Sequence, residues 1–570
     1  MDDVAVPRID EAEYLADVRS RQDRIWPTGI PKAPHYPLGE IALTEYLRKR
    51  ARIAPDEPLY DFYGRTVSYG EVDRLSDRFA AQLQADGIVA GDRVAVFLGN
   101  CPQFAVAFFG ILKAGAIHVP VNPMFKEHEL AYELNDTEAR VIVADHALMP
   151  IVNAVRAETK LEKAYATGLG ELIPDPPAFH VPASVSAAPR SSDGADDLLI
   201  AIAAAGEPTP HEADLDAVAA LNYTGGTTGM PKGCVHTQRD MVYTAAKAII
   251  TNAPLDDRDV TVNFHPMFWI AGEDLGLIFP VVAGARCVLL ARWDPVSCME
   301  AIHRTRAKRL VMLVDNAVEM MEHPRVAEFD LTSLQTSSVS SFVKKLNHDY
   351  RERWRALTGT TMVELSWGMT ETHTCDTFTI GLQSDDFDLS LQPILVGLPV
   401  PETELKICDF ETGAILPLGT EGEILVRSPS LLKGYWNKPD ATREAFRGDW
   451  LRTGDLGVID EFGLLHFLGR RKEMLKVKGM SVFPAELEAL LGRHPDVVAS
   501  GVIGREDPER GQVPVAFVRL REGAGASAAD IEAWCRDAMA AYKRPEVRVV
   551  DELPMTATGK VKKHELAALL

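Results

Sequence analysis

Hydrophobic and polar positions alternate with two different periods in the N-terminal part of the chain. Between residues 42 and 121, amphipathic stretches with the spacing of helices are interleaved with short apolar runs of strand length. The run at 94–98 is apolar throughout, as expected for a strand covered on both faces. Strands that alternate with helices predict parallel βαβ units. The expected helices are 43–53, 69–87 and 105–114, and the expected strands are 58–63, 94–98 and 117–121.

The pattern differs on either side of this region. An acidic segment at 11–18 predicts a helix, and the prolines that follow it keep the chain extended. Residues 183–212, rich in Ala, Ser, Asp, Gly and Pro, predict a loose surface connection. The last hundred or so residues predict a compact α/β unit, large enough for a small domain, with Ser527 capping its last helix. Its expected elements are helices 484–493 and 527–542 and strands 497–503 and 513–521.

Composition agrees with a globular protein of more than one domain. At 570 residues the chain is too long for one ordinary core, and 46% of its residues are apolar and 25% charged. A net charge of −22 argues against a nucleic-acid partner. The most apolar window, 104–121, is interrupted by Lys113, His118 and Pro120, so we expect no membrane span, and no secretory signal is visible. Seven scattered cysteines predict free thiols in the cytoplasm rather than disulfides or a Cys/His metal site.

A loop rich in glycine and threonine, 224–232, follows the apparent end of a strand. Glycines let backbone N–H groups approach an anion closely, threonine hydroxyls add donors, and Lys232 adds a positive charge. This composition predicts a polyphosphate-binding loop, although an ordinary surface turn is the alternative. The loop lacks the Gly-x4-Gly-Lys-Ser/Thr pattern of Walker-type NTPases. Its candidate nucleotide ligands are Thr224, Gly225, Gly226, Thr227, Thr228, Gly229 and Lys232.

Residues 223–233 have the sequence Tyr-Thr-Gly-Gly-Thr-Thr-Gly-Met-Pro-Lys-Gly. This sequence resembles the phosphate-binding signature of the adenylate-forming superfamily, which includes acyl-CoA synthetases, 4-coumarate–CoA ligases, luciferases and peptide-synthetase adenylation domains. Gly225 stands where the family usually has serine. Four further segments resemble other motifs of the family and occur in the family's order, at 364–371, 450–455, 469–488 and 554–561. The resemblance implies an α/β fold with a large multi-subdomain N-terminal domain, 1–469, and a small mobile α+β C-terminal domain, 470–570.

The resemblance also implies roles for individual residues. In the first of these segments Trp367, in place of the family's tyrosine, would stack near adenine, Thr370 would touch the α-phosphate, and Glu371, with Thr224, would bind Mg²⁺. Each charged candidate has an ordinary surface position as its alternative. The other candidates are Asp455 for the ribose hydroxyls, Arg470 and Gly479 for the nucleotide, Lys472 as hinge, Lys476 for thioester formation and Lys560 for adenylation.

The acyl pocket is expected around the segment 263–272 and next to Gly368. Phe268, Trp269 and Gly272 suggest an apolar pocket for a hydrophobic or ring-containing acid, with simple core packing of Trp269 as the alternative. Trp269 stands where relatives have histidine. A second departure is the stretch 340–342, Ser-Ser-Phe, where relatives have a glycine-rich turn against adenine. Added side chains there would narrow the nucleotide slot.

We therefore expect an acyl-CoA ligase that uses ATP, Mg²⁺ and coenzyme A and passes through an acyl-adenylate. One alternative is an enzyme that performs only thioester formation on a preformed acyl-adenylate, which the atypical 340–342 stretch favours. Another is a non-catalytic acyl- or nucleotide-binding protein, which the joint retention of Glu371, Asp455, Lys476 and Lys560 disfavours. A carrier-protein thiol as acceptor and a homo-oligomer both remain open.

Overall fold

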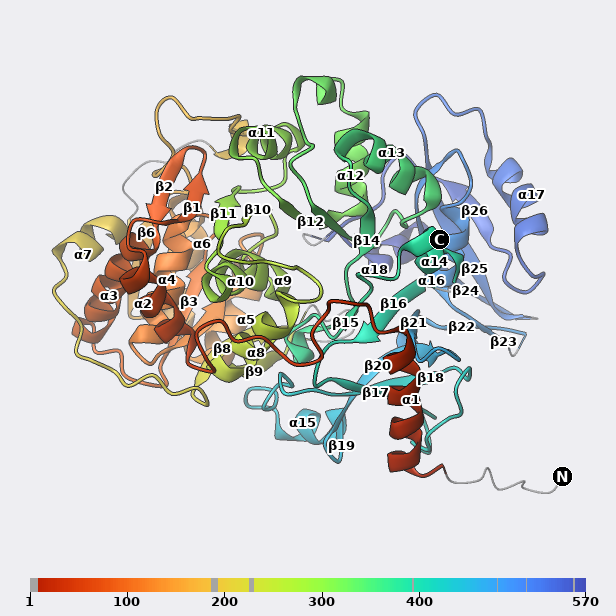
Figure 1. Cartoon of the computed structure of the whole chain (residues 1–570), viewed down its shortest axis with the longest axis horizontal. Coiled ribbons are helices and arrows are strands. Elements are labelled where there is room, and N and C mark those ends of the chain that lie inside the picture. The colour runs from red at the N-terminus through yellow and green to blue at the C-terminus, as the bar shows by residue number, and fades with distance from the viewer. Residues whose placement is uncertain are drawn as a thin grey trace.

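Two parallel sheets form the N-terminal half of the molecule (Figure 1). The computed structural model describes residues 9–185, 193–224, 230–391, 394–478, 480–508, 510–556 and 559–570. In the first sheet the strand order is β7-β6-β5-β3-β4-β8-β9, and only β9 runs antiparallel to its neighbour. Its strands are β3 (Arg93–Phe97), β4 (Ile117–Pro120), β5 (Val141–Asp145), β6 (Lys163–Thr167), β7 (Asp196–Asp197), β8 (Val218–Tyr223) and β9 (Gly233–Thr237).

The second sheet has the order β14-β13-β12-β10-β11-β1-β2. Although β1 comes before the whole first sheet in sequence, it pairs with β11, where Tyr60 lies opposite Cys287. The chain therefore starts one sheet, builds the other, and then returns. Its strands are β1 (Pro58–Phe62), β2 (Arg65–Ser68), β10 (Val260–Asn263), β11 (Arg286–Leu289), β12 (Arg309–Leu313), β13 (Thr336–Ser340) and β14 (Met362–Glu364).

One hydrophobic cluster joins the two sheets and the helices beside them. Every residue of α4 is buried, which explains the apolar window seen in the sequence. The buried Lys113 within it forms ion pairs of 2.5 Å with Asp73 and 3.0 Å with Asp77, both on α3. The helices of this half are α2 (Leu43–Ile53), α3 (Tyr69–Ala85), α4 (Pro102–Lys113), α5 (Glu127–Thr137), α6 (Met149–Val155), α7 (Leu198–Ala204), α8 (Gln238–Ala248), α9 (Ile270–Glu273), α10 (Phe279–Ala283), α11 (Pro295–Thr305), α12 (Val314–Glu322) and α13 (His348–Thr358).

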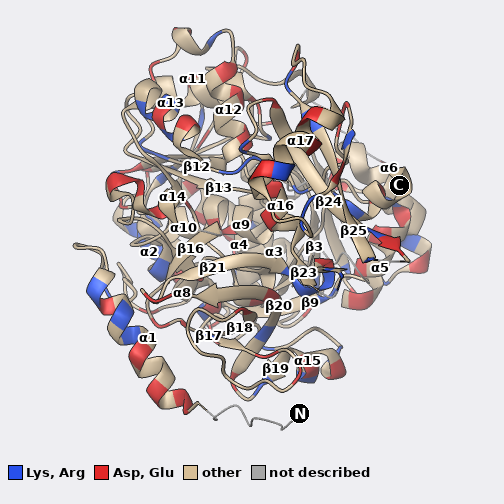
Figure 2. Ribbon diagram, turned by 90° about the vertical axis from the view of Figure 1, so that its right-hand side faces the viewer, with Lys and Arg blue, Asp and Glu red and all other residues tan. Residues whose placement is uncertain are grey.

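A third, antiparallel sheet has the order β15-β16-β21-β20-β18-β17, and β19 pairs with β20. The N-terminal helix α1 (Glu11–Ile25) lies beside it, far from the other N-terminal elements (Figure 1). It buries Tyr14, Leu15 and Val18 against this sheet and carries mixed charges along its length (Figure 2). The other elements are α14 (Phe387–Ser390), α15 (Pro439–Ala445), β15 (Thr377–Phe378), β16 (Ile394–Pro399), β17 (Glu404–Cys408), β18 (Gly422–Arg427), β19 (Phe446–Arg447), β20 (Trp450–Ile459) and β21 (Leu465–Arg470).

The C-terminal unit is a separate sheet, β23-β22-β25-β24 with β26 beside β25, and it has its own hydrophobic cluster. Ser527 caps α17 as predicted, since its side chain accepts a hydrogen bond from the Asp530 backbone N–H. No helix in the described ranges is long and apolar enough to cross a membrane. The elements are β22 (Leu475–Val477), β23 (Met480–Val482), α16 (Pro484–Leu491), β24 (Val497–Asp507), β25 (Gly511–Leu520), α17 (Ala528–Ala538), β26 (Glu546–Val549) and α18 (Lys563–Leu566).

The predicted elements agree with the structure to within a few residues, except in two places. The prediction of a loose connection over 183–212 is wrong for the middle of this stretch, where the chain forms β7 and α7. Asp197 caps α7, and the helix buries Leu198 and Ile202, so a short amphipathic pattern was hidden in an alanine-rich stretch. The first helix also continues well beyond residue 18, to Ile25.

Candidate functional site

The phosphate-loop candidates lie where β8 ends and the chain turns back into β9. The Thr224 N–H donates to the Lys232 carbonyl at 3.0 Å, and the Thr224 hydroxyl accepts from the Lys232 N–H at 3.3 Å. These bonds hold the two ends of the loop together. Gly225, Gly226, Thr227, Thr228 and Gly229 lie outside the described residues, as does Gly479.

Tyr435 connects two of the predicted ligands, and the sequence interpretation missed it. Its hydroxyl donates to Glu371 Oε1 at 2.9 Å, while Lys232 Nζ lies 3.9 Å from the centre of its ring. The Glu371 carboxylate is only 9% exposed, and no cationic side chain among the described residues pairs with it. A nearby contact fixes Thr370, whose carbonyl lies 2.8 Å from the His236 Nε2 atom. The only local signal for Tyr435 was an aromatic residue in a loop.

A strained turn directly follows Glu371. His373, Thr374 and Cys375 all have positive φ, of 57°, 59° and 55°, a conformation that is unfavourable for a β-branched threonine. The turn packs against Gly368, where a Cβ atom would lie 2.7 Å from the Cys375 nitrogen. Gly368 is therefore required for close backbone packing. Gly272 has the same kind of role, because a Cβ there would lie 1.9 Å from the Pro266 carbonyl oxygen.

The predicted ribose ligand, Asp455 on β20, is buried among other predicted site residues. The indole N–H of Trp367 donates to its Oδ2 at 3.0 Å, and Arg470 Nε lies 3.1 Å from its Oδ1. Burial raises the pKa of Asp455, while the charges of Arg470 and Lys560 lower it and that of Glu371 raises it. Four of the other predicted residues, Trp367, Arg470, Lys560 and Glu371, are thus near enough to influence the Asp455 carboxylate.

The two candidate catalytic lysines occupy different surroundings. Lys560 Nζ lies 4.8 Å from the centre of the Phe342 ring. Partial removal of the ammonium group from water and the positive charge of Arg470 lower the pKa of Lys560, while part of the side chain remains exposed. Lys476 is exposed on β22, where its backbone N–H donates to the Gln512 side chain at 2.9 Å. Lys472 lies in the short helical turn that follows β21. Lys560 is therefore close enough to interact with Arg470 and Asp455, two residues predicted to bind the nucleotide.

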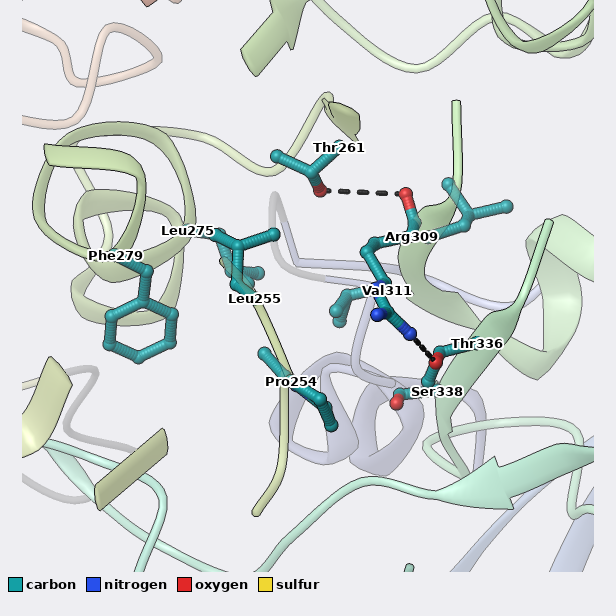
Figure 3. A pocket seen from close by; sticks show the side chains of 11 residues that line it. Pro254, Leu255, Thr261, Leu275, Phe279, Arg309, Val311, Thr336 and Ser338 are labelled. Carbon is teal, nitrogen blue, oxygen red and sulfur yellow. Dashed lines mark hydrogen bonds between the residues drawn. The ribbon is translucent and has the colours of Figure 1, made fainter. Parts of the chain in front are cut away.

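A small cavity lies between β12, β13 and the helix that follows Trp269 (Figure 3). It measures about 20 Å³, enough for one or two water molecules. Its walls are mainly apolar, and Arg309 at one side is held by Asp259 at 3.1 Å and by Thr336. Apolar lining residues include Leu255, Leu275, Phe279 and Val311.

Two aromatic residues that depart from the family pattern lie near each other. Trp269 is half-exposed rather than part of the core, and its ring centre is 6.5 Å from that of Phe342, at an interplanar angle of 60°. Phe268 is also half-exposed and packs at the edge of the main hydrophobic cluster. Lys560 Nζ lies 4.8 Å from the centre of the same Phe342 ring, so this ring is close both to the acyl-gate position and to the candidate adenylation lysine.

Comparison with known proteins gives a consistent result. Residues 47–436 match the family model described as AMP-binding enzyme, and residues 486–560 match that of the AMP-binding enzyme C-terminal domain. A 4-coumarate–CoA ligase-like protein from Oryza sativa subsp. japonica is 32% identical, with 99% of this chain and 98% of the relative covered. A long-chain-fatty-acid–CoA ligase from Bacillus subtilis is 29% identical, with 95% and 96% covered.

Comparison with solved structures gives the same result as comparison with the sequences. The anthranilate CoA ligase AuaEII in complex with anthranoyl-AMP gives a TM-score of 0.80 at 28% identity, covering 93% of this chain and 98% of that one. ATP-bound MatB from Rhodopseudomonas palustris gives a TM-score of 0.78 at 27% identity, covering 93% and 99%.

Proposed function

The chain belongs to the AMP-binding enzyme family, and we propose on that premise that it activates a hydrophobic carboxylic acid and transfers it to coenzyme A. It is an AMP-forming acid–thiol ligase that makes an acyl-CoA through an acyl-adenylate. The observation that best supports the residue roles is the placement of Lys560 beside Phe342, where it also influences Asp455. A cation close to the proposed ribose ligand supports a role for Lys560 in the adenylation step.

In the first half-reaction the acid's carboxylate attacks the α-phosphorus of ATP, and pyrophosphate leaves. Catalysis of phosphoryl and nucleotidyl transfer depends mainly on positioning and on neutralising charge. Lys560 would neutralise the carboxylate and the α-phosphate, Lys232 and the loop at 224–232 would hold the leaving phosphates, and Asp455 would accept hydrogen bonds from the ribose.

A Mg²⁺ ion fits the residues around Glu371. This buried carboxylate has a neutral tyrosine hydroxyl as its hydrogen-bond partner and no cationic partner in the described ranges, so it offers oxygen to a hard cation. Bound there, with Thr224 as a possible second ligand from the loop, the ion would supply positive charge beside the phosphates.

In the second half-reaction the thiol of coenzyme A attacks the acyl carbonyl and AMP leaves. We propose that the unit 470–570 rotates about Lys472, which withdraws Lys560 and brings Lys476 and the stretch around Gly479 to the site. Hinge residues of this kind lie in short connections between rigid bodies. The position of Lys472, between β21 and β22, meets that requirement.

The acid is proposed to be hydrophobic. Apolar side chains line most of the cavity in Figure 3, and the half-exposed rings of Trp269 and Phe342 lie 6.5 Å apart at the position proposed for the acyl gate. A cavity of about 20 Å³ has to widen before it can hold an acyl chain, so its lining residues must move if the acid binds there.

The decisive experiment is acid-dependent exchange of labelled pyrophosphate into ATP without coenzyme A. The acids named for the relatives, a long-chain fatty acid, 4-coumarate and anthranilate, start the panel, and acetate is the small control. Exchange with a large apolar acid and little with acetate is expected. A preference for acetate contradicts the hydrophobic pocket, and no exchange together with thioester formation from supplied acyl-adenylate contradicts the adenylation half.

Two lysine variants separate the half-reactions. Lys560→Ala should lower the exchange rate at least 100-fold and leave thioester formation from acyl-adenylate within a few-fold of wild type. Lys476→Ala should do the reverse. Equal losses in both assays for either variant would contradict the division of labour between the two lysines.

A further inference from the structure

The two oxygens of the Asp455 carboxylate have different partners. Oδ2 accepts the indole N–H of Trp367 at 3.0 Å. Oδ1 accepts no hydrogen bond from any residue in the described ranges, and its nearest charged neighbour is Arg470 Nε at 3.1 Å. Both side chains are buried, with Trp367 5% and Asp455 4% exposed. One oxygen is thus fixed by a donor, while the other has capacity left for a ligand.

Trp367 is held firmly enough to act as such an anchor. Its backbone N–H donates to the Thr377 hydroxyl at 2.8 Å, and its carbonyl accepts from the Asp376 N–H at 2.9 Å. Its ring belongs to the hydrophobic cluster of the third sheet, which includes Val426 and Leu451. The indole cannot turn away from Asp455 without leaving that cluster.

Asp455 is fixed from its own strand as well. Its backbone N–H donates to the Thr453 hydroxyl at 3.0 Å, and the Thr453 hydroxyl in turn donates to the Ile424 carbonyl on the neighbouring strand at 2.7 Å. The remaining freedom of the carboxylate is rotation of its side chain. The bond from Trp367 to Oδ2 removes that rotation and determines where Oδ1 points.

We propose that Trp367 is a positioning residue that orients Asp455, so that Oδ1 accepts a ribose hydroxyl of the nucleotide. The proposal rests on the proposed function and adds a role beyond ring stacking. A phenylalanine at this place has no donor, and a tyrosine carries its O–H at the tip of a smaller ring and not at the position of the indole N–H, so the observed bond depends on tryptophan in this chain. A hydrogen bond to a charged acceptor is also stronger than a neutral one and favours the ionised carboxylate.

Binding of AMP, measured by calorimetry, tests the proposal without relying on turnover. The protein variants are wild type, Trp367→Phe and Trp367→Tyr, and the two probes are AMP and 2′,3′-dideoxy-AMP, which lacks both ribose hydroxyls. Either variant should weaken AMP about tenfold, the usual effect of one hydrogen bond to a charged group. Either should change dideoxy-AMP less than about twofold. The acid-side midpoint of AMP binding should also rise in pH, because the carboxylate has lost a donor.

Trp293→Phe is a matched control. The Trp293 indole also donates to a carboxylate, Glu319, at 2.6 Å, but it lies in the connection between β11 and α11, outside the sheet that carries Asp455. AMP binding should be unchanged in this variant.

The other outcomes contradict the proposal in distinguishable ways. Equal weakening of AMP and dideoxy-AMP would mean that the ring only stacks, and unchanged AMP binding would mean that the bond to Oδ2 does not matter. Either result overturns the role of Trp367 and leaves the proposed function intact. A wild-type protein that binds neither AMP nor ATP overturns both.

Discussion

Replacing Glu273 by glutamine should stabilise the protein at alkaline pH and leave it unchanged in acid. Glu273, at the end of α9, is completely buried. Its Oε2 accepts from the Asn222 side chain at 3.0 Å, while Oε1 has no hydrogen-bond partner among the described residues. Burial raises its pKa to about 7. His118 lies 3.9 Å away but provides no counter-charge, because burial lowers its pKa to about 3.

The size of the expected stabilisation follows from the difference between the pKa of Glu273 in the folded chain and its pKa in the unfolded chain. A rise from the ordinary value of 4.5 to about 7, at about 1.4 kcal/mol for each pH unit, corresponds to about 3 kcal/mol. Because the folded-state pKa is the higher one, the stabilising effect of the neutral carboxyl is complete below pH 4.5 and is lost as the pH rises through 7. Glutamine stays neutral at every pH and keeps an oxygen for Asn222.

Urea unfolding at pH 5, 6, 7 and 8 measures this directly. The difference in the free energy of unfolding between Glu273→Gln and wild type should be below about 1 kcal/mol at pH 5 and approach about 3 kcal/mol at pH 8. Glu444→Gln, on an exposed helix, is the control and should show no trend. A difference that is constant from pH 5 to 8 would refute the reasoning, because it would mean that the carboxyl has the same protonation in both states.

Three further changes have defined expectations. Tyr435→Phe removes the hydroxyl that orients Glu371, so the Mg²⁺ concentration for half-maximal pyrophosphate exchange should rise about tenfold, measured by titrating Mg²⁺ at saturating ATP. Lys247→Met leaves the fully buried Asp376 without its cation at 3.5 Å and should cost about 3–5 kcal/mol of unfolding free energy in a urea titration. Phe342→Leu removes the ring beneath the adenylation lysine and should slow exchange several-fold, while thioester formation from acyl-adenylate stays unchanged.

The local elements could be predicted from the sequence because their signals are local. The helix 69–87 and the apolar strand 94–98 correspond to α3 and β3 with ends shifted by one or two residues. Which sheet a strand joins is not a local property. The early strand β1 pairs with β11, more than 200 residues later, and no periodicity within either segment carries that information.

Sequence motifs identified most of the described candidate site residues, because a motif is also a local signal. They missed residues that contact the candidate site from distant parts of the chain. Trp367, Asp455 and Arg470 come from three separate segments, and the structure brings their side chains into contact. Tyr435 and His236 act on the segment around Glu371 from loops and strands of other sheets, so their roles became visible only with the contacts themselves.

The departures from the family pattern have a different meaning once they are seen in place. The sequence of the stretch 340–342 predicts a narrowed nucleotide slot and favours the alternative in which the adenylation step is lost. In the structure the Phe342 ring lies 4.8 Å from Lys560 Nζ and 6.5 Å from the centre of the Trp269 ring. A cation over an aromatic face is attracted to it, most strongly where water is partly excluded. The ring is therefore close to two residues with proposed roles, the adenylation lysine Lys560 and the acyl-gate residue Trp269. Under these proposed roles, acid binding and the placement of the lysine would influence each other through this one ring, which a glycine at the position would not allow.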